Sequence, residues 1–272
     1  LLVVPDSLFV RLIYAEPIVI AFWRSLTSGV FVLIIVIYFY GLSGFKDIIN
    51  TRFYGLFYGI LIASTAPAFV LAVSNTSVAN VVFIFASMPV FAAIFSRIFL
   101  GEHIKILLVI TMGVVAVGLF FIAYGSTKVQ IASWNGDIWA IYVSAAFAAA
   151  LTLVRSAKIV SMVPAIPFAY LGGALVLSFF ISPLEVRPQD WNLILMHGTL
   201  IGASSCLLTL GPRFISSSEV ALLILLESVL APILVWLILG EHPGQYAIIG
   251  GFIIISALCF FNLYNLSKLP RR

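Results

Sequence analysis

Apolar runs long enough to cross a lipid bilayer follow one another through almost the whole chain, and they limit its fold more than any other feature. Of the 272 residues, 63% are apolar and 9% are charged, and the mean hydropathy is +1.21. A soluble domain carries roughly 25% charged residues, so this chain has too few polar groups to cover a globular surface. The composition therefore excludes a soluble enzyme, a nucleic-acid-binding protein and a disordered protein, and it predicts an integral membrane protein.

The apolar runs divide into nine segments of the length that a spanning helix needs, about 20 residues. Since irregular backbone cannot face lipid, each segment is expected to be helical. The stretch before them, residues 1–14, is apolar but shorter, and we interpret it as the end of a tenth helix whose beginning is missing. The predicted fold is an all-α integral membrane protein with ten transmembrane helices, the first one truncated. The nine full segments are residues 17–42, 52–74, 77–100, 104–124, 137–158, 164–183, 191–212, 217–239 and 245–265.

Basic residues favour one orientation of these helices. With the N-terminus in the cytoplasm, the outer side receives Arg11, Lys128 and Arg187, and Arg24 falls within a helix. All other basic residues then lie on the cytoplasmic side, as the positive-inside rule requires. We therefore expect a multi-pass protein of the inner (cell) membrane with both termini in the cytoplasm. The cytoplasmic basic residues are Lys46, Arg52, Arg97, Lys105, Arg155, Lys158, Arg213, Lys268, Arg271 and Arg272.

A four-residue motif that occurs twice reveals an internal repeat. Residues 100–103 and residues 239–242 both read Leu-Gly-Glu-His, an offset of 139, and at the same offset Gly59 meets Gly198. Apolar identities alone carry little weight in a membrane protein. A motif that contains Glu and His and is in phase with matched glycines is far more specific, so it indicates a duplication.

The two copies are expected to have opposite orientations in the membrane. The repeats are residues 1–125 and 126–272, and further upstream their offset becomes 147, where Pro17 meets Pro164. Each repeat holds five predicted helices, and an odd number places the second copy upside down relative to the first. Inverted repeats are typical of secondary transporters, whose halves move around a site near the middle of the bilayer.

Three parts of the chain resemble the EamA branch of the drug/metabolite transporter superfamily. Residues 9–24 are similar to its opening motif, residues 88–102 to its fourth-helix motif, and residues 227–241 to the ninth-helix copy of that motif. One departure is Ser228, where the family often has proline after the glutamate. The resemblance implies ten helices, cytoplasmic termini, and export or exchange of small metabolites such as amino acids.

Arg24 is a candidate for substrate binding because it sits about 10 Å inside its helix, at 1.5 Å per residue. A charge at this depth is costly and normally faces a cavity or a partner. Its planar guanidinium could clamp a substrate carboxylate. The alternatives are a structural partner for helix ends, or a side chain that reaches up to the outer headgroups.

Glu227 is the second charged candidate and lies near the middle of its segment. It could carry a proton or hold a substrate amine, and burial would favour its neutral form. The alternative is a permanently protonated carboxyl that bonds to a neighbouring helix. The repeat pairs Glu227 with Met88, next to Ser87, and so predicts one partly polar face in both copies.

Prolines and small residues complete the predicted site. Pro89 and Pro232 interrupt the fourth and ninth helices, where they are either hinges or static kinks. The pairs Gly55 with Gly59 and Gly198 with Gly202 are expected to let helices pack closely. Hydroxyl residues are weaker candidates, because hydroxyls often bond to their own helix. The remaining predicted substrate-binding residues are Ser64, Thr65, Asn80, Ser87, Tyr142, His197 and Ser204.

The favoured function is a secondary transporter that moves small polar or amphipathic metabolites by alternating access. An intramembrane enzyme would need convergent catalytic groups, and the three histidines, His103, His197 and His242, are spread over different depths. A channel or a structural membrane protein is the other alternative. We expect no cofactor and no metal site. The expected partners are a small-molecule substrate, protons as a possible coupling ion and membrane lipid, without nucleic acid, in a monomer or homodimer.

The topology is testable with cysteines introduced at Lys128 and Arg187. Because both positions are assigned to the outer side, an impermeant thiol reagent is expected to label both in intact cells. Protection of both positions would contradict the ten-helix topology.

Overall fold

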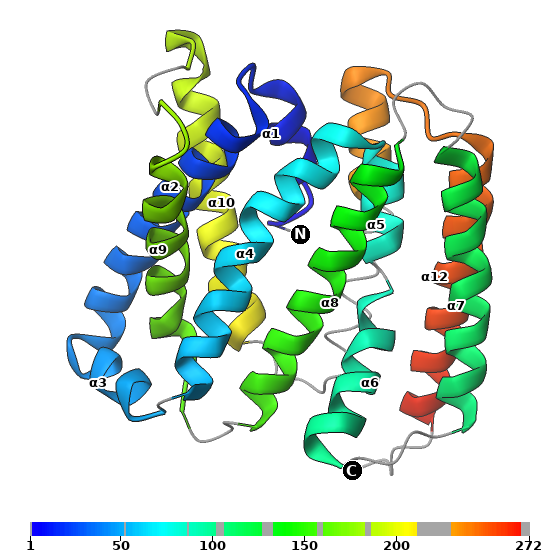
Figure 1. Cartoon of the computed structure of the whole chain (residues 1–272), viewed down its shortest axis with the longest axis horizontal. Helices are drawn as coiled ribbons and strands as arrows, with labels where there is room; N and C mark the ends of the chain where they lie inside the picture. The colour runs from blue at the N-terminus through cyan, green and yellow to red at the C-terminus, as the bar shows by residue number, and fades with distance from the viewer. Residues whose placement is uncertain are drawn as a thin grey trace.

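The computed structural model is helical throughout the part of the chain that it describes (Figure 1). It describes residues 2–51, 53–85, 87–101, 106–126, 133–156, 160–182, 186–210 and 230–267. No strand occurs within these ranges. The longer α-helices are α2 (Pro17–Tyr40), α4 (Phe53–Asn75), α7 (Ile106–Ser126), α8 (Trp134–Ser156), α9 (Ile166–Ser178), α10 (Trp191–Leu210) and α12 (Gln245–Ser267). The shorter ones are α1 (Asp6–Leu12), α3 (Ser43–Asn50), α5 (Val78–Phe85), α6 (Met88–Leu100) and Leu230–Leu239, with the 3-10 turns η1 (Val163–Ala165) and η2 (Pro188–Asp190).

The repeated motif marks the ends of two helices. Gly101 follows α6 and Gly240 follows Leu230–Leu239, and both adopt left-handed backbone, with φ of 67° and 69°. A residue with a side chain is strained there, whereas glycine ends a helix at no steric cost. This explains why the glycine of the motif recurs in both copies.

The membrane-length parts of the chain run in alternating directions between two faces of the molecule, with α5 and α6 both descending (Figure 1). We call the upper face the end at which α1 finishes and α8 begins, and the lower face the end at which α2 and α10 finish (Figure 1). Helices that the repeat pairs are antiparallel: α2 descends while α9 ascends, and α4 ascends while α10 descends. The outermost pair behaves likewise, because α7 ascends while α12 descends. An inverted repeat requires this relation.

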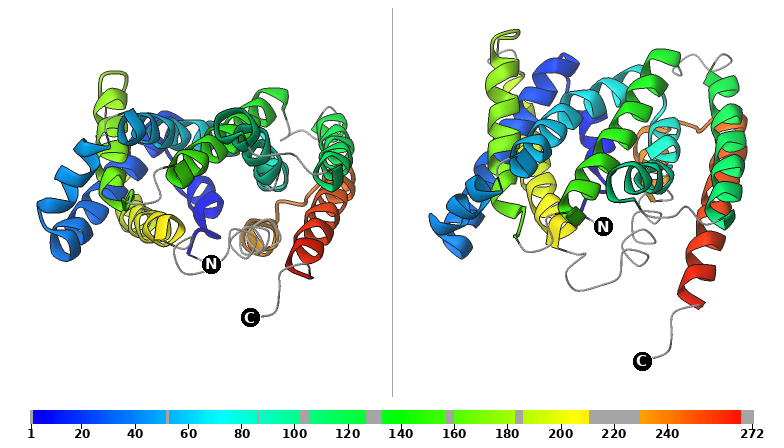
Figure 2. Two further views of the ribbon diagram at one scale, coloured as in Figure 1. Left: turned by 90° about the horizontal axis from the view of Figure 1, so that it is seen from below. Right: turned by 60° about the horizontal axis from the view of Figure 1, so that its bottom comes forward.

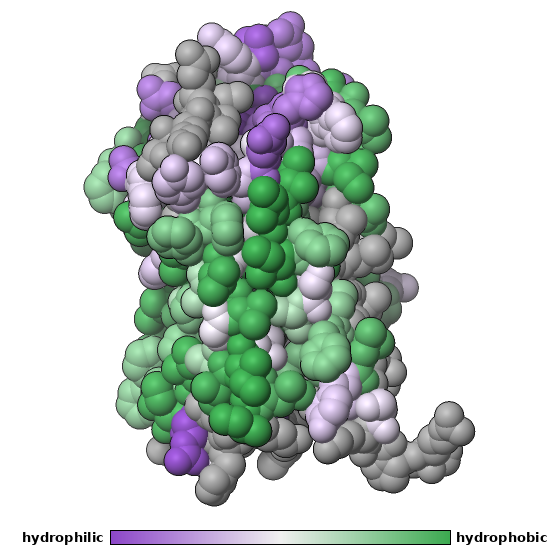
Figure 3. Space-filling view, turned by 90° about the vertical axis from the view of Figure 1, so that its right-hand side faces the viewer, coloured by the Kyte–Doolittle hydropathy of each residue, from purple (hydrophilic) through white to green (hydrophobic). Residues whose placement is uncertain are grey.

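Long apolar helices connect the two faces of the molecule. Five helical stretches are long and apolar enough to cross a bilayer, namely Pro17–Tyr40, Phe53–Asn75, Val78–Phe99, Trp134–Ser156 and Pro188–Leu210, and shorter apolar helices accompany them. The helices α7 and α12 pack along each other at one edge (Figure 2). Their outer side is apolar over its middle and hydrophilic toward the upper end (Figure 3). The fold is therefore that of a helical membrane protein with α7 and α12 at its periphery.

The fourth predicted helix is not continuous. The helix α5 ends at Phe85 and α6 begins at Met88. Pro89 lies in the first turn of α6, where its missing N–H is not needed for helical hydrogen bonding. Just before α6, Ser87 donates its backbone N–H to the carbonyl of Ile84, three residues earlier, at 3.0 Å. The short helix α3 on the lower face was not predicted.

Glycines bring α10 into close contact with α2. A Cβ atom at Gly198 would collide with the side chain of Thr27, and one at Gly202 would lie 2.8 Å from the ring of Phe31. The expected close approach at these two glycines is confirmed. Their counterparts differ, since a Cβ at Gly59 would meet nothing within 4 Å and Gly55 faces only the end of α3.

The repeat supplies a matched pair of substitutions. Gly198→Ala is expected to destabilise the protein by about 1–3 kcal/mol because it overpacks the contact with α2. Gly59→Ala, at the equivalent position of the first repeat, has free space and gains helix propensity of up to about 1 kcal/mol. Thermal unfolding of the two variants in the same detergent measures the difference. Equal melting temperatures would contradict the close contact.

Candidate functional site

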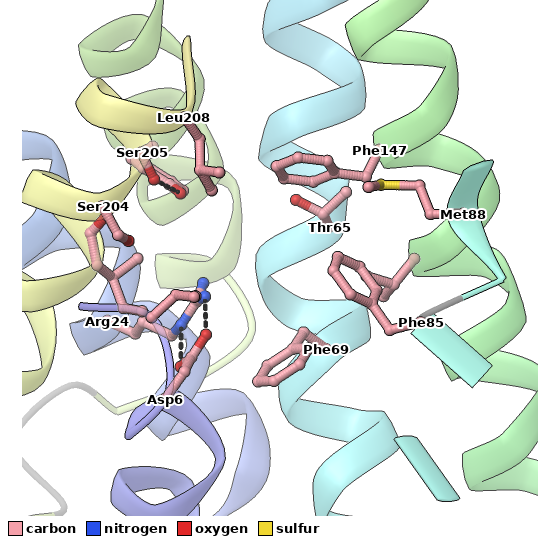
Figure 4. Close-up of a pocket in the computed structure, with 14 residues that line it drawn as sticks. Asp6, Arg24, Thr65, Phe69, Phe85, Met88, Phe147, Ser204, Ser205 and Leu208 are labelled. Carbon is pink, nitrogen blue, oxygen red and sulfur yellow. Dashed lines mark hydrogen bonds and ion pairs between the residues drawn. The ribbon is translucent and has the colours of Figure 1, made fainter. Parts of the chain in front are cut away.

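A cavity lies between the two repeats, at the middle of the molecule (Figure 4). It offers about 60 Å³ to the centres of water molecules, which is room for a few of them. Both repeats contribute to its walls, and no residue of α7 or α12 does so. The lining residues are Val3, Asp6, Arg24, Thr65, Phe69, Phe85, Met88, Val143, Phe147, Tyr170, Ile201, Ser204, Ser205 and Leu208.

The cavity has one polar wall and one apolar wall. The helices α1, α2, α9 and α10 provide the charged groups and most of the hydroxyls. The helices α4, α5, α6 and α8 provide aromatic and aliphatic side chains, together with the hydroxyl of Thr65 on α4 (Figure 4). On the polar wall, the hydroxyls of Tyr170 and Ser205 lie 2.8 Å apart. On the apolar wall, Phe85 and Met88 flank the break between α5 and α6. A ligand that fits both walls has a polar end and an apolar body.

A buried ion pair dominates the polar wall. The guanidinium of Arg24 donates from Nε to Asp6 Oδ1 at 3.1 Å and from Nη2 to Asp6 Oδ2 at 2.6 Å. Arg24 and Asp6 are only 7% and 4% exposed. Phe69 lies under the guanidinium, 5.5 Å from Cζ to the ring centre. Arg24 Nη1 makes no hydrogen bond to any residue within the described ranges, so one edge of the fork remains available beside the cavity.

His197 adds a third member to this cluster. Its Nε2 lies 2.6 Å from Asp6 Oδ1, and its ring stacks on Phe9 at 5.3 Å between centres. Because a carboxylate can only accept hydrogen bonds, Nε2 carries the hydrogen. One carboxylate therefore holds two nitrogenous side chains, Arg24 and His197, from two different helices. We call Asp6, Arg24 and His197 the buried triad.

Two of the predicted hydroxyl residues line the cavity in equivalent ways. Thr65 on α4 and Ser204 on α10 are related by the offset of 139. Each donates its hydroxyl to the carbonyl three residues earlier, at 2.7 Å to Ile62 and 2.9 Å to Ile201. Since their donors are used within the helix, what they offer a ligand is the acceptor capacity of the oxygen.

Other predicted residues lie outside the cavity. Tyr142 is 41% exposed, and its hydroxyl donates to Ser64 at 2.8 Å, so these two residues tie α8 to α4. Ser87 is buried at the break between α5 and α6, donates to Ile84 at 2.6 Å and approaches Ser144 at 3.5 Å. None of these positions lines the cavity, so the structure does not bring them together with Arg24.

Asn80 belongs to a polar network near the upper face. Its side-chain amide donates to Thr76 at 3.2 Å and to Asp137 at 3.3 Å, and Thr76 in turn donates to Asp137 at 2.9 Å. These bonds join the start of α5 to the start of α8. Asn80 therefore links the two repeats above the cavity.

A second link between the repeats lies on the same face. Arg11 at the end of α1 pairs with Glu241 at 3.2 Å and donates to the carbonyl of Thr76 at 2.8 Å. Glu241 also accepts the backbone N–H of Val78 at 2.9 Å. The upper end of the molecule is thus closed by contacts between α1, the start of α5 and the turn before α12.

The described residues cover only one of the two residues predicted at the ninth helix. Glu227 lies outside the described residues. Pro232 is buried near the start of Leu230–Leu239 and lines a small pocket together with Val78 and Ala79 of α5. A hinge role for Pro232 or Pro89 stays a prediction. Within the described ranges, no cluster of three or more His, Cys, Asp or Glu residues is placed to hold a metal ion.

Sequence reasoning missed Asp6 as the partner of Arg24. The available signal was that a buried guanidinium needs a counter-charge, and the chain has few acidic residues in apolar surroundings. Asp6 lies in the short opening stretch, which is too short to be read as a full transmembrane helix. The repeat gave no help, since an offset of 147 pairs Asp6 with Leu153 and Arg24 with Leu171.

The ion pair is expected to be essential for stability. Asp6→Asn keeps the shape of the side chain but leaves the charge of Arg24 buried without compensation, which costs about 3–5 kcal/mol. Arg187→Gln is the control, since Arg187 pairs with Asp190 at 3.1 Å with its side chain 44% exposed, and a surface pair contributes about 0–1 kcal/mol. Thermal unfolding in detergent checks both. Comparable losses in the two variants would show that the buried pair is not special.

Comparisons with known proteins match this architecture. The sequence pattern of the EamA-like transporter family matches residues 7–124 and again residues 134–263. The uncharacterized transporter YdfC of Bacillus subtilis (strain 168) is 24% identical over 63% of this chain, and the match spans 58% of that protein's length. A crystal structure described only as that of a protein aligns with 98% of this chain and 96% of its own, with a TM-score of 0.64 and 13% identity, which shows a shared fold. Because the family pattern covers nearly the whole chain in two copies, the protein belongs to the EamA-like transporter family.

Proposed function

We propose that the protein is a secondary transporter that moves a small amphipathic metabolite, such as an amino acid or a related carboxylate, across the inner membrane by alternating access. The observation that carries this proposal is the cavity, which both repeats enclose and which joins a guanidinium on one wall to aromatic side chains on the other. Inverted repeats around such a cavity are the usual construction of alternating-access carriers. Export or exchange, with both termini cytoplasmic and ten transmembrane helices, completes the proposal.

The polar wall suits a carboxylate. Arg24 lines the cavity and has N–H groups that Asp6 does not use, and charge-assisted bonds from arginine to carboxylate are among the strongest hydrogen bonds in proteins. The acceptors at Thr65 and Ser204 suit a donor on the substrate, such as an amine. The apolar wall, with Phe69 and Phe147, suits an aliphatic or aromatic side chain.

Closure at the upper face fits a carrier rather than an open channel. The contacts of Arg11 with Glu241 and of Asn80 with Asp137 join the two repeats above the cavity. In the proposed cycle these contacts break when the cavity opens toward that side. Glu227 remains a candidate for contact with substrate or proton, because its partner in the repeat, Met88, lines the cavity.

The proposal is tested by exchange in proteoliposomes. Purified protein is screened against amino acids, monocarboxylates and nucleotides by thermal shift, since a ligand raises the melting temperature. Radiolabelled hits are then measured in vesicles with and without unlabelled compound inside. We expect saturable uptake that internal substrate accelerates. Flux that is not saturable and not accelerated would identify a channel instead.

Arg24→Lys is expected to retain folded protein but to lower exchange roughly tenfold. A lysine keeps the charge but loses the planar fork, and one charge-assisted hydrogen bond is worth about 1.5 kcal/mol or more. Arg187→Gln, which alters a distant arginine of the upper face, is expected to exchange at the rate of the unaltered protein. If Arg24→Lys exchanges equally fast, the guanidinium does not bind substrate.

A further inference from the structure

One carboxylate in the cavity wall is shared by two groups that can each be cationic. Asp6 Oδ1 accepts from Arg24 Nε and from His197 Nε2, and Asp6 Oδ2 accepts from Arg24 Nη2. All three side chains are more than nine-tenths buried. Among the described residues, the nearest other titratable group facing the triad is Tyr170 of α9, whose hydroxyl is engaged with Ser205. Within the part of the chain that the structure describes, the triad and Tyr170 are therefore the titratable side chains that face one another here.

The charges in the triad balance when His197 is neutral. Arg24 carries one positive charge and Asp6 one negative charge, so a protonated His197 would leave an uncompensated positive charge in the hydrophobic layer, which is costly. Neutral His197 keeps its hydrogen on Nε2, where it donates to Asp6. Its Nδ1 then has a free lone pair and bonds to no described residue, so it is the atom that can accept a proton.

A bound carboxylate changes this balance. A carboxylate that engages a guanidinium with both oxygens needs two neighbouring N–H groups. Asp6 takes the N–H of Nε and one of the two N–H groups of Nη2, so the outer edge of the guanidinium, formed by Nη1 and the second N–H of Nη2, is available. A substrate carboxylate can bind this edge while Asp6 stays in place, and it adds one negative charge to a site that was neutral. Two carboxylates then share the single positive charge of Arg24, and one of them, Asp6, also faces His197.

We propose, building on the transport function above, that Asp6 and His197 form the proton-binding site of the carrier and that each anionic substrate bound by Arg24 is accompanied by one proton. The substrate carboxylate pairs with Arg24, and a proton taken up from water forms a bond to His197 Nδ1. The resulting imidazolium stays paired with Asp6 through Nε2. No covalent bond other than that to the proton forms or breaks, and the site remains neutral before and after binding.

The two repeats differ at the position that this role requires. The offset of 139 pairs His197 with Tyr58, which also reaches across to another helix, with its hydroxyl 3.3 Å from that of Thr209. A tyrosine hydroxyl does not take up a proton near neutral pH, whereas an imidazole does. Both repeats therefore carry a polar ring at this position, but only His197, the one beside Asp6, can take up a proton near neutral pH.

Nitrogen-15 NMR of the histidine side chains of the full chain in detergent tests the proposal without a known substrate. The His197 signal is identified by its loss in His197→Gln, and its shift distinguishes neutral imidazole from imidazolium. Arg24→Gln removes one positive charge from the site and so leaves one negative charge without compensation, as a bound carboxylate would. We expect neutral His197 in the unaltered protein and imidazolium in Arg24→Gln at the same near-neutral pH. Arg24→Lys keeps the positive charge and is expected to leave His197 neutral. Arg187→Gln, which alters an arginine far from the triad, is expected to do the same.

A second arm uses the unaltered protein with benzoate, an aromatic carboxylate, and benzamide, its uncharged counterpart. Excess benzoate is expected to convert His197 to imidazolium, and benzamide is expected to leave it neutral. If Arg24→Gln does not fold, the benzoate arm decides alone. Neutral His197 in every folded sample overturns the proposal. Absence of exchange in proteoliposomes together with imidazolium in Arg24→Gln would instead count against transport and leave the proton site in place.

Discussion

The contact between Arg24 and Asp6 is the constraint on which the rest of the site depends. Two opposite charges inside a hydrophobic layer are tolerated only when they are paired and hydrogen-bonded. The pair fixes α1 against α2, and His197 fixes α10 to the same carboxylate. Glycines at positions 198 and 202 allow α10 to approach α2 closely enough for this arrangement. The polar wall of the cavity is therefore a consequence of how these three helices satisfy one buried carboxylate.

Hydropathy and the repeat were sufficient to predict most of the helices. The segments found as α2 and α4 begin and end within two residues of the predicted bounds, and α10 begins at the predicted residue, because apolar length is what a bilayer selects. The break between α5 and α6 was foreseen only as an interruption at Pro89. The amphipathic helix α3 lies on the lower face. It was not predicted because its charged residues interrupt the apolar run.

The candidate site was predicted less completely, because depth in the membrane does not determine which way a side chain points. Arg24, Thr65 and Ser204 do line the cavity, whereas Ser64, adjacent to Thr65, turns toward Tyr142. Neighbouring residues on a helix differ by about 100° in direction, so packing decides which one faces the cavity. Asp6 was not predicted, since it has no counterpart in the second repeat and its role appears only once α1 is placed against α2.

The buried triad also bears on how the membrane voltage acts on the proposed carrier. Moving one elementary charge through 100 mV costs about 2.3 kcal/mol, so a carrier with a lone arginine in its cavity would be pulled toward one side. Here the guanidinium of Arg24 travels with the carboxylate of Asp6, and their charges cancel. The empty carrier can therefore return across the bilayer without work against the electrical potential. Asp6, which a helix of only seven residues contributes, would thus make the return of the empty carrier insensitive to the membrane voltage.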